Sequence, residues 1–168
     1  EFIEGFASGL SLADAKAPQK VSRTGRVYQS GIGPHTEDET VSLVLNAMDS
    51  NGLAPFSHEK QIKYPELKRQ KCDLLVSRGA AKLYIEVKMM RLFGDNGKPN
   101  DNIFMHILSP YARQNSALTD IKKLQESGFQ GDKAIVIYGY DYTDYPLEDM
   151  MRCFETLAGS RIGQRHYN

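Results

Sequence analysis

Two short segments, residues 72–77 (CDLLVS) and 82–90 (KLYIEVKMM), constrain the fold of this chain more than any other feature. Both are rich in residues that favour β-strands, and only the four residues Arg78-Gly79-Ala80-Ala81 separate them. A parallel pair needs a crossover of about a dozen residues or more, whereas so short a connection suits an antiparallel hairpin. The segments therefore predict a β-hairpin.

The register of this hairpin gathers charged side chains on one face. With the turn centred between Gly79 and Ala80, Asp73 faces Glu86 across the pair. Because side chains alternate along a strand, one face is polar and the other apolar. The polar face carries Asp73, Leu75, Tyr84, Glu86 and Lys88, and the apolar face carries Cys72, Leu74, Val76, Leu83, Ile85 and Val87.

The facing carboxylates of Asp73 and Glu86 predict a metal site. Their Cβ atoms would lie about 4.5–5.5 Å apart, and two carboxylates so close destabilise each other's charge. A cation between them removes that penalty, and hard oxygen ligands favour Mg²⁺ or Mn²⁺ over Zn²⁺. Lys88 lies two residues beyond Glu86 and so points to the same face. Carboxylates, a divalent ion and a lysine are the parts that phosphodiester hydrolysis needs.

The remaining segments predict an α/β (α+β) fold with a central mixed β-sheet flanked by helices. The connection between residues 90 and 133 passes through a helix, so the last strand can run parallel to the strand before it. Thr36 and Glu39 form a capping box that begins the second helix. The expected helices are residues 1–16, 36–50, 114–127 and 147–157, and the expected further strands are residues 58–64 and 133–140.

Asp73 followed by Leu-Leu-Val, with Ile85-Glu86-Val87-Lys88 on the next strand, resembles the PD-(D/E)xK nuclease superfamily. The order of elements over residues 36–140 is similar to the restriction-endonuclease-like core of that family. Cys72 stands where the motif has a proline. The resemblance implies that Asp73 and Glu86 bind the metal, that the Val87 carbonyl adds a ligand, and that Lys88 orients or activates the attacking water.

Some members of this superfamily use a helix carboxylate near the metal, which makes Glu37 a further catalytic candidate. The alternative for Glu37 is a first-turn acid favoured by the helix dipole. Mg²⁺ is the expected cofactor, and Mn²⁺ is expected to substitute for it. No small-molecule cofactor is expected, because the sequence has no P-loop or comparable motif.

The charges of the chain are unevenly distributed. It carries 21 Lys plus Arg against 21 Asp plus Glu, which excludes a polyanion binder that is basic all over. Residues 60–91 nevertheless hold nine basic residues and three acidic ones, a balance that suits a phosphate backbone. Lys71 and Arg91 of this stretch are candidate nucleic-acid contacts, and a solvated strand surface is the alternative.

Arg113, Gln114 and Asn115 are also candidate nucleic-acid contacts, at the start of the helix expected over residues 114–127. Helix N-termini attract phosphate, and Arg and Gln can read base edges in the major groove. Simple capping and solvation of the helix is the alternative.

The length of 168 residues predicts one domain, which the resemblance implies is a nuclease domain. It is expected to have an N-terminal arm over residues 1–35, a core over 36–140 and a C-terminal helix over 146–158. No apolar run approaches the roughly 20 residues that span a bilayer, so no membrane partner is expected. The two cysteines, Cys72 and Cys153, form no disulfide framework, which predicts a cytoplasmic location.

The expected function is that of a Mg²⁺-dependent deoxyribonuclease acting on double-stranded DNA. A type II restriction endonuclease is the first hypothesis, and such enzymes are expected as homodimers because a palindromic site presents two equivalent strands. Two alternatives stay open. One is a nuclease-fold module that binds nucleic acid or protein without cutting, and the other is a repair or junction-resolving nuclease.

Overall fold

The computed structural model describes residues 1–53, 55–67, 69–94, 98–100 and 104–167. Contacts within the chain divide it into two compact units. The first unit comprises Glu1–Pro55, Phe93–Lys98 and His166–Asn168, and the second comprises Phe56–Leu92 and Pro99–Arg165. The core expected over residues 36–140 runs through both units, and its organisation as a single domain stays a prediction.

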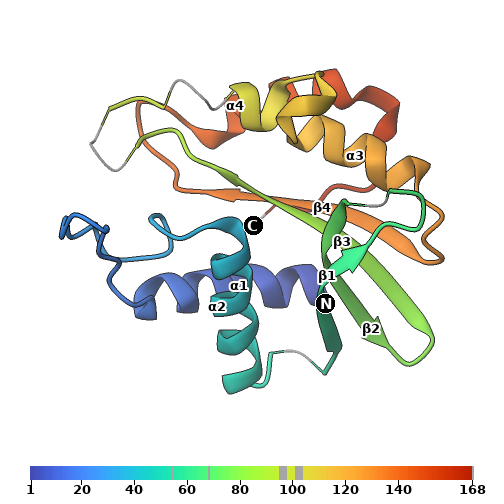
Figure 1. Ribbon diagram of the computed structural model, residues 1–168, viewed down its shortest axis with the longest axis horizontal. Coiled ribbons are helices and arrows are strands. Elements are labelled where there is room, and N and C mark those ends of the chain that lie inside the picture. The colour runs from blue at the N-terminus through green and yellow to red at the C-terminus, as the bar shows by residue number, and fades with distance from the viewer. Residues whose placement is uncertain (54, 68, 95–97, 101–103, 168) are drawn as a thin grey trace. The chain divides into compact units, whose positions relative to one another are not determined.

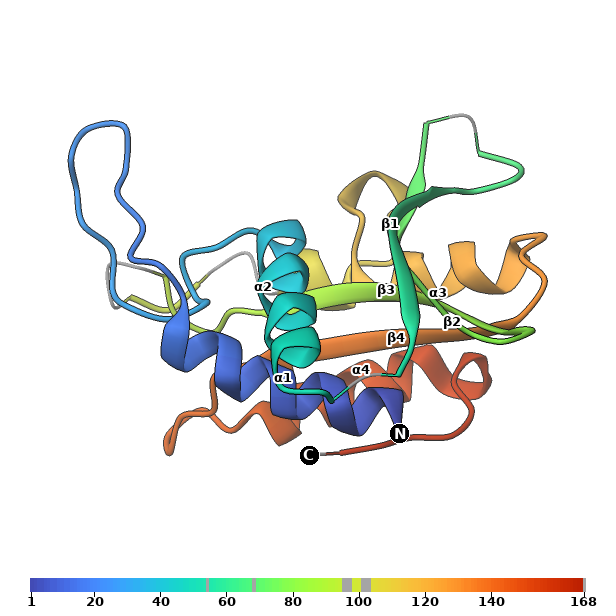
Figure 2. The same ribbon diagram turned by 90° about the horizontal axis from the view of Figure 1, so that it is seen from below.

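A four-stranded mixed sheet forms the centre of the second unit (Figure 1). In spatial order its strands are β1 (Ser57–Lys63), β2 (Lys71–Arg78), β3 (Ala81–Met90) and β4 (Asp132–Gly139). The first three strands are antiparallel neighbours, whereas β4 runs parallel to β3, and both views show the two side by side (Figure 2). Each strand begins and ends within one residue of its predicted bounds, and the α+β class with a mixed sheet is confirmed.

The hairpin of β2 and β3 has the predicted register. Leu74 pairs with Ile85 and Ser77 pairs with Lys82. Gly79 turns the chain with a φ of 60°, a conformation that glycine adopts without the steric penalty of a side chain. One apolar residue departs from its expected face: Cys72 belongs to the buried cluster of Tyr64, Tyr84, Leu124 and Phe129.

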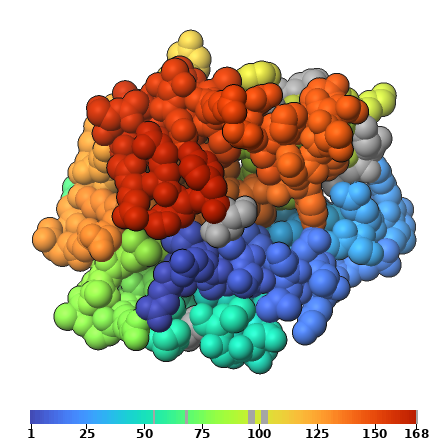
Figure 3. All heavy atoms as spheres, turned by 180° about the vertical axis from the view of Figure 1, so that it is seen from behind, coloured from blue at the N-terminus to red at the C-terminus, as the bar shows by residue number. Residues whose placement is uncertain are grey.

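Two helices of the second unit, α3 (Ala117–Glu126) and α4 (Leu147–Ala158), cover one face of β3 and β4 (Figure 1). Ile135 and Ile137 of β4 pack against the buried cluster that joins these elements. The cluster consists of Met90, Ile107, Ala117, Leu118, Ile121, Phe154 and Ala158. The outward side of α4 and of the residues that follow it is visible in Figure 3.

The start of α3 differs from the prediction. Residues 112–114 form a separate 3-10 turn, and Asn115 takes a left-handed conformation with a φ of 49°. Ser116 then caps the helix by accepting a hydrogen bond from the Thr119 N–H, at 3.2 Å. Helical hydrogen bonding therefore begins at Ala117, three residues later than residue 114.

The first unit contains α1 (Phe2–Lys16) and α2 (Glu37–Ser50), which contact each other. Gly9 allows this close contact, because a Cβ atom at that position would lie 2.7 Å from Met48 Cγ. The predicted capping box is confirmed: the Glu39 N–H donates to Thr36 Oγ1 and the Thr36 N–H donates to Glu39 Oε2. Lys20, 2.6 Å from the same carboxylate, lowers the pKa of Glu39 to about 2.

No helix in the described part of the chain combines the length and the apolar character needed to cross a membrane.

Candidate active site

The regular pairing of β2 with β3 ends next to Asp73. There the Asp73 side chain, and not a main-chain carbonyl of β2, accepts a hydrogen bond from β3. The β2–β3 pairing runs from Arg78↔Ala81 to Leu74↔Ile85. One step further on, the Val87 N–H donates to Asp73 Oδ2 at 2.8 Å. On the other side of β2, the pairing with β1 passes from Lys60↔Leu74 to Ile62↔Cys72, and Gln61 between them has a φ of 60°. The Asp73 carboxylate is therefore held against β3.

Glu86 lies deep in the same site and is only 2% exposed. The Tyr64 hydroxyl donates to Glu86 Oε1 at 2.6 Å, and Lys123 Nζ lies 3.6 Å from the same oxygen. Burial raises the pKa of Glu86 to about 8, and the negative charges of Asp120 and Asp73 act in the same direction. A hydrogen bond with Asp73 also favours the protonated form. The two carboxyl groups expected to face each other are thus brought together.

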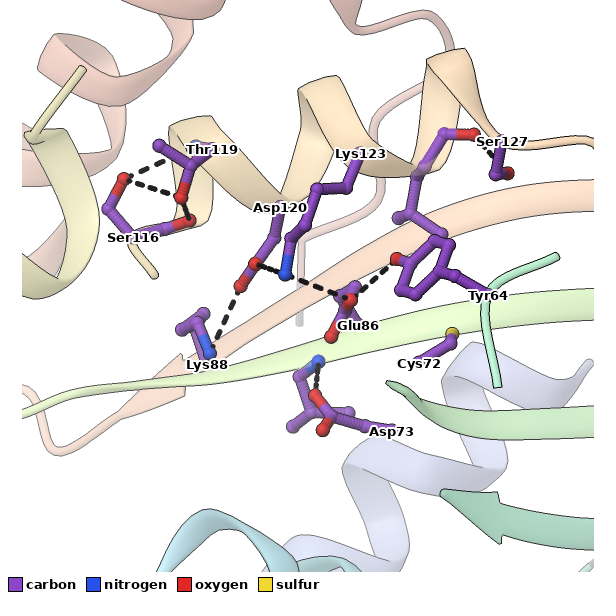
Figure 4. A network of polar contacts seen from close by, with 12 residues as sticks. Tyr64, Cys72, Asp73, Glu86, Lys88, Ser116, Thr119, Asp120, Lys123 and Ser127 are labelled. Carbon is purple, nitrogen blue, oxygen red and sulfur yellow. Dashed lines mark hydrogen bonds and ion pairs between the residues drawn. The ribbon is translucent and has the colours of Figure 1, made fainter. Parts of the chain in front are cut away.

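Lys88 points to the same face of β3, where it meets α3. Its Nζ lies 3.0 Å from Asp120 Oδ2, and Lys123 forms an ion pair with the other oxygen of Asp120. Figure 4 shows Tyr64, Glu86, Lys123, Asp120 and Lys88 as one continuous chain of polar contacts between β3 and α3. The site therefore includes residues of α3 and Tyr64 in addition to those of the hairpin from which it was predicted.

Tyr64, Asp120 and Lys123 were not singled out from the sequence. A usable signal exists for Asp120, because it shares the helical stripe of Ala117, Ile121 and Leu124, where a core helix places apolar residues. A charged residue on such a stripe needs a buried partner. No comparable local pattern marks Tyr64, which follows β1 directly.

A buried cluster of mainly aromatic side chains packs around Tyr64, next to Glu86. The rings of Tyr84 and Phe129 stack with centroids 4.0 Å apart, and the Tyr64 ring lies 4.9 Å from that of Phe129. Burial raises the pKa of Cys72 to about 12, with a further contribution from the charge of Glu86. Burial and the Glu86 charge likewise raise the pKa of Tyr64, so its hydroxyl stays protonated and donates to Glu86.

The donor set suits a hard divalent ion bound by few protein ligands. Asp73 and Glu86 supply carboxylate oxygens, and the Val87 carbonyl lies next in the chain. Among the described residues, no three His, Cys, Asp or Glu side chains are grouped so as to hold a metal ion. Mg²⁺ is usually bound by one or two carboxylates and keeps waters or substrate phosphates as its other ligands. A buried carboxylate whose pKa is raised by another carboxylate also gains from a cation beside it.

The helix candidate Glu37 lies in the first turn of α2 and is half-buried. It belongs to the first unit, whereas Asp73, Glu86 and Lys88 belong to the second. Its role near the metal stays a prediction. Glu39, two residues on, has the capping role that was expected of it.

The candidate nucleic-acid contacts lie at the ends of elements of the second unit. Lys71 is exposed at the start of β2, and Arg91 is half-buried directly after β3, where its guanidinium donates to Met89 Sδ at 3.5 Å. Arg113 and Asn115 are exposed and Gln114 is half-buried. The last three precede α3 and do not form its first turn, because Ser116 caps the helix. Their placement at a helix start is therefore wrong, and a contact with nucleic acid stays a prediction.

Chemically, the site combines two carboxyl groups that favour a cation with a lysine on the same strand face. No family model matches this chain, and comparison with curated proteins and with solved structures gave no match. The function is therefore inferred from the geometry of the site.

Proposed function

We propose that this protein is a divalent-metal-dependent nuclease that hydrolyses phosphodiester bonds of double-stranded DNA. The observation that carries the proposal is the buried Glu86 beside the half-buried Asp73, with Lys88 on the same face of β3. Burial and the charges of Asp120 and Asp73 raise the pKa of Glu86, and such a carboxyl group next to a lysine suits a bound Mg²⁺ and a negatively charged substrate. The PD-(D/E)xK pattern and the mixed sheet support a restriction-endonuclease-like core.

Each residue of the site would have a separate role. Asp73 and Glu86 would hold Mg²⁺, with the Val87 carbonyl as a further ligand, and Mn²⁺ would substitute. The ion supplies a Lewis acid and lowers the pKa of bound water. The Lys88 ammonium would orient the attacking water and stabilise the negative charge that develops on the phosphate.

Exposed cations support DNA as the substrate. Lys71 and Arg113 present side chains to solvent at the ends of elements in the same unit as the site. Contacts of this kind neutralise phosphates and position a protein on a duplex without reading its sequence. A type II restriction enzyme would act as a homodimer, since a palindrome has two equivalent strands.

The proposal is tested with plasmid DNA and Mg²⁺ or Mn²⁺. We expect metal-dependent cleavage by the unaltered chain. Asp73→Asn and Glu86→Gln should abolish it because they remove ligand charge, and Lys88→Met should lower kcat by about 10²–10³-fold. Discrete fragments would identify a restriction enzyme, whereas preferred cleavage of flaps or four-way junctions would identify a repair or junction-resolving nuclease.

The matched control is Lys122→Met, which removes an exposed lysine of α3 that is 3.9 Å from Glu126. It should cleave as the unaltered chain does. Full activity in any of the three site variants, with their folding verified by circular dichroism, would contradict the proposed roles.

A second function is favoured by the internal pairing of the charges. Lys88 and Lys123 already contact Asp120, and Glu86 accepts from Tyr64. A network paired in this way can serve structure alone, in which case the chain would be a nuclease-fold module that binds DNA or protein without cutting. Its signature is salt-sensitive DNA binding with no cleavage in either metal.

A further inference from the structure

Asp120 is a buried acid in a position where a core helix normally has an apolar residue. It is 1% exposed and lies on the stripe of α3 that includes Ala117, Ile121 and Leu124. An unpaired carboxylate at such a depth would be strongly unfavourable. Its surroundings therefore have to explain its presence.

The two oxygens of Asp120 contact two different lysines. Lys123, three residues along the same helix, pairs with Oδ1, and Lys88 from β3 approaches Oδ2 to 3.0 Å. Lys123 thus ties the carboxylate to its own helix, and the second oxygen is directed at the strand (Figure 4).

Stability alone is a weak reason for this arrangement. Removing two charges from water costs about as much as their attraction returns, and well-packed apolar residues often replace a buried ion pair without loss. A lysine side chain also has a flexible four-carbon stem, so its ammonium has no fixed position unless a partner holds it. The Asp120 carboxylate is such a partner for the Lys88 ammonium.

The position of α3 is itself fixed at its N-terminus. The Ser116 hydroxyl donates to the Ser109 carbonyl at 2.5 Å and also accepts from the Thr119 N–H. The start of the helix is thereby attached to the preceding segment, one turn before Asp120. A carboxylate carried on a fixed helix can hold a lysine of the neighbouring strand at a defined point.

We propose that Asp120 is a positioning residue that holds the Lys88 ammonium in place on the face of β3 that carries Glu86. The effect of this positioning on DNA cleavage rests on the proposed nuclease function. The contact by which Asp120 retains the Lys88 ammonium does not rest on it. Lys123 completes the arrangement by fixing Asp120 and reaching Glu86 Oε1 at 3.6 Å.

The hold on Lys88 is tested without DNA. The chain is treated with a small amine-reactive acetylating reagent, and mass spectrometry follows the modification of each lysine with time. In Asp120→Asn, Lys88 should be acetylated several-fold faster than in the unaltered chain, because its ammonium loses the ion pair with the Asp120 carboxylate. Glu126→Gln, which breaks an exposed pair on the same helix, is the matched control and should leave the Lys88 rate unchanged. An unchanged Lys88 rate in Asp120→Asn would overturn the proposal.

The consequence for cleavage is tested on the same proteins. Asp120→Asn should lower kcat by about 10–100-fold with little change in KM, the effect expected when a residue acts through another. Asp120→Glu keeps the charge and should recover part of the loss. Equal losses in the two variants, or a loss that follows their thermal unfolding temperatures, would overturn positioning in favour of a structural role.

If Asp120→Asn does not fold, Asp120→Glu alone tests whether Asp120 positions Lys88. In that variant we expect Lys88 to remain slow to acetylate. We also expect kcat to fall while the unfolding temperature stays that of the unaltered chain. Faster acetylation of Lys88 in that folded variant would overturn the proposal. Absence of cleavage by the unaltered chain would contradict the proposed nuclease, and the acetylation rates would still support or overturn the hold of Asp120 on Lys88.

Discussion

At Glu86, burial and two neighbouring acids act on the same proton. Desolvation disfavours the carboxylate, and the charges of Asp120 and Asp73 disfavour it further, whereas Lys123 favours it. The sum places the pKa at about 8 instead of the ordinary 4.5. Without a divalent ion, the site therefore holds a proton at neutral pH that a metal would have to displace.

Metal binding should consequently depend on pH. Below about pH 8 Glu86 retains a proton, so Mg²⁺ affinity should rise with pH and level off above that value. Near pH 7, binding should release about one proton per ion. Titration calorimetry in two buffers of different ionisation enthalpy measures this release. Glu86→Gln is the control, and a binding enthalpy that is the same in both buffers would contradict the prediction.

At this scale the sequence predicts part of the site. Alternation along a strand and the length of one turn were enough to bring Asp73, Glu86 and Lys88 together, because these are local properties of the hairpin. Asp120 and Lys123 could not be found in this way. Their contacts depend on how α3 lies across β3, which no spacing within the chain specifies.

Among the elements, α3 depends most on a single residue at its start. Ser116 is fully buried and bonds both to the Thr119 N–H and to the Ser109 carbonyl. Strand bounds were predicted to within one residue, since hydrophobic patterning marks β2, β3 and β4, and Pro65 marks the end of β1. The start of α3 was placed too early because Arg113 and Gln114 are compatible with a helix, and only the left-handed Asn115 and the Ser116 cap exclude them.

Removing this cap should weaken the second unit. In Ser116→Ala, α3 loses a capping acceptor and the Ser109 carbonyl loses a donor, so the free energy of unfolding should fall by about 1–2 kcal/mol. Urea denaturation followed by circular dichroism gives the value. Thr156→Ala, which removes an exposed hydroxyl bonded to the Arg152 carbonyl of α4, should change it by less than about 0.5 kcal/mol. If Ser116→Ala and Thr156→Ala lowered the free energy of unfolding equally, the Ser116 cap would contribute no more to stability than an exposed hydroxyl.

Across the whole molecule, the balance of 21 positive and 21 negative residues limits how DNA can be bound. A neutral chain has no general attraction to a polyanion, so binding has to come from local cations. Each phosphate contact then adds a definite salt dependence, about −0.9 in the slope of log affinity against log salt concentration.

A substitution at Lys71 tests whether local cations account for DNA binding. Binding of a duplex in the absence of divalent ions should weaken as salt rises, and Lys71→Gln should lower affinity and make the slope shallower by about one. Fluorescence anisotropy over a salt series gives both quantities. Glu126→Gln, an exposed change on α3, should leave the slope unaltered. A Lys71→Gln slope equal to that of the unaltered chain would exclude a phosphate contact at this residue.

The contrast between the two cysteines has a practical consequence for such measurements. Cys72 is enclosed with Tyr64 beside Glu86, and its thiol has a pKa of about 12, so almost none of it is reactive thiolate at neutral pH. Cys153 lies exposed on α4. A maleimide dye therefore attaches to the unmutated chain at one known point, and an optical reporter of binding and assembly can be introduced while every residue of the site keeps its native identity.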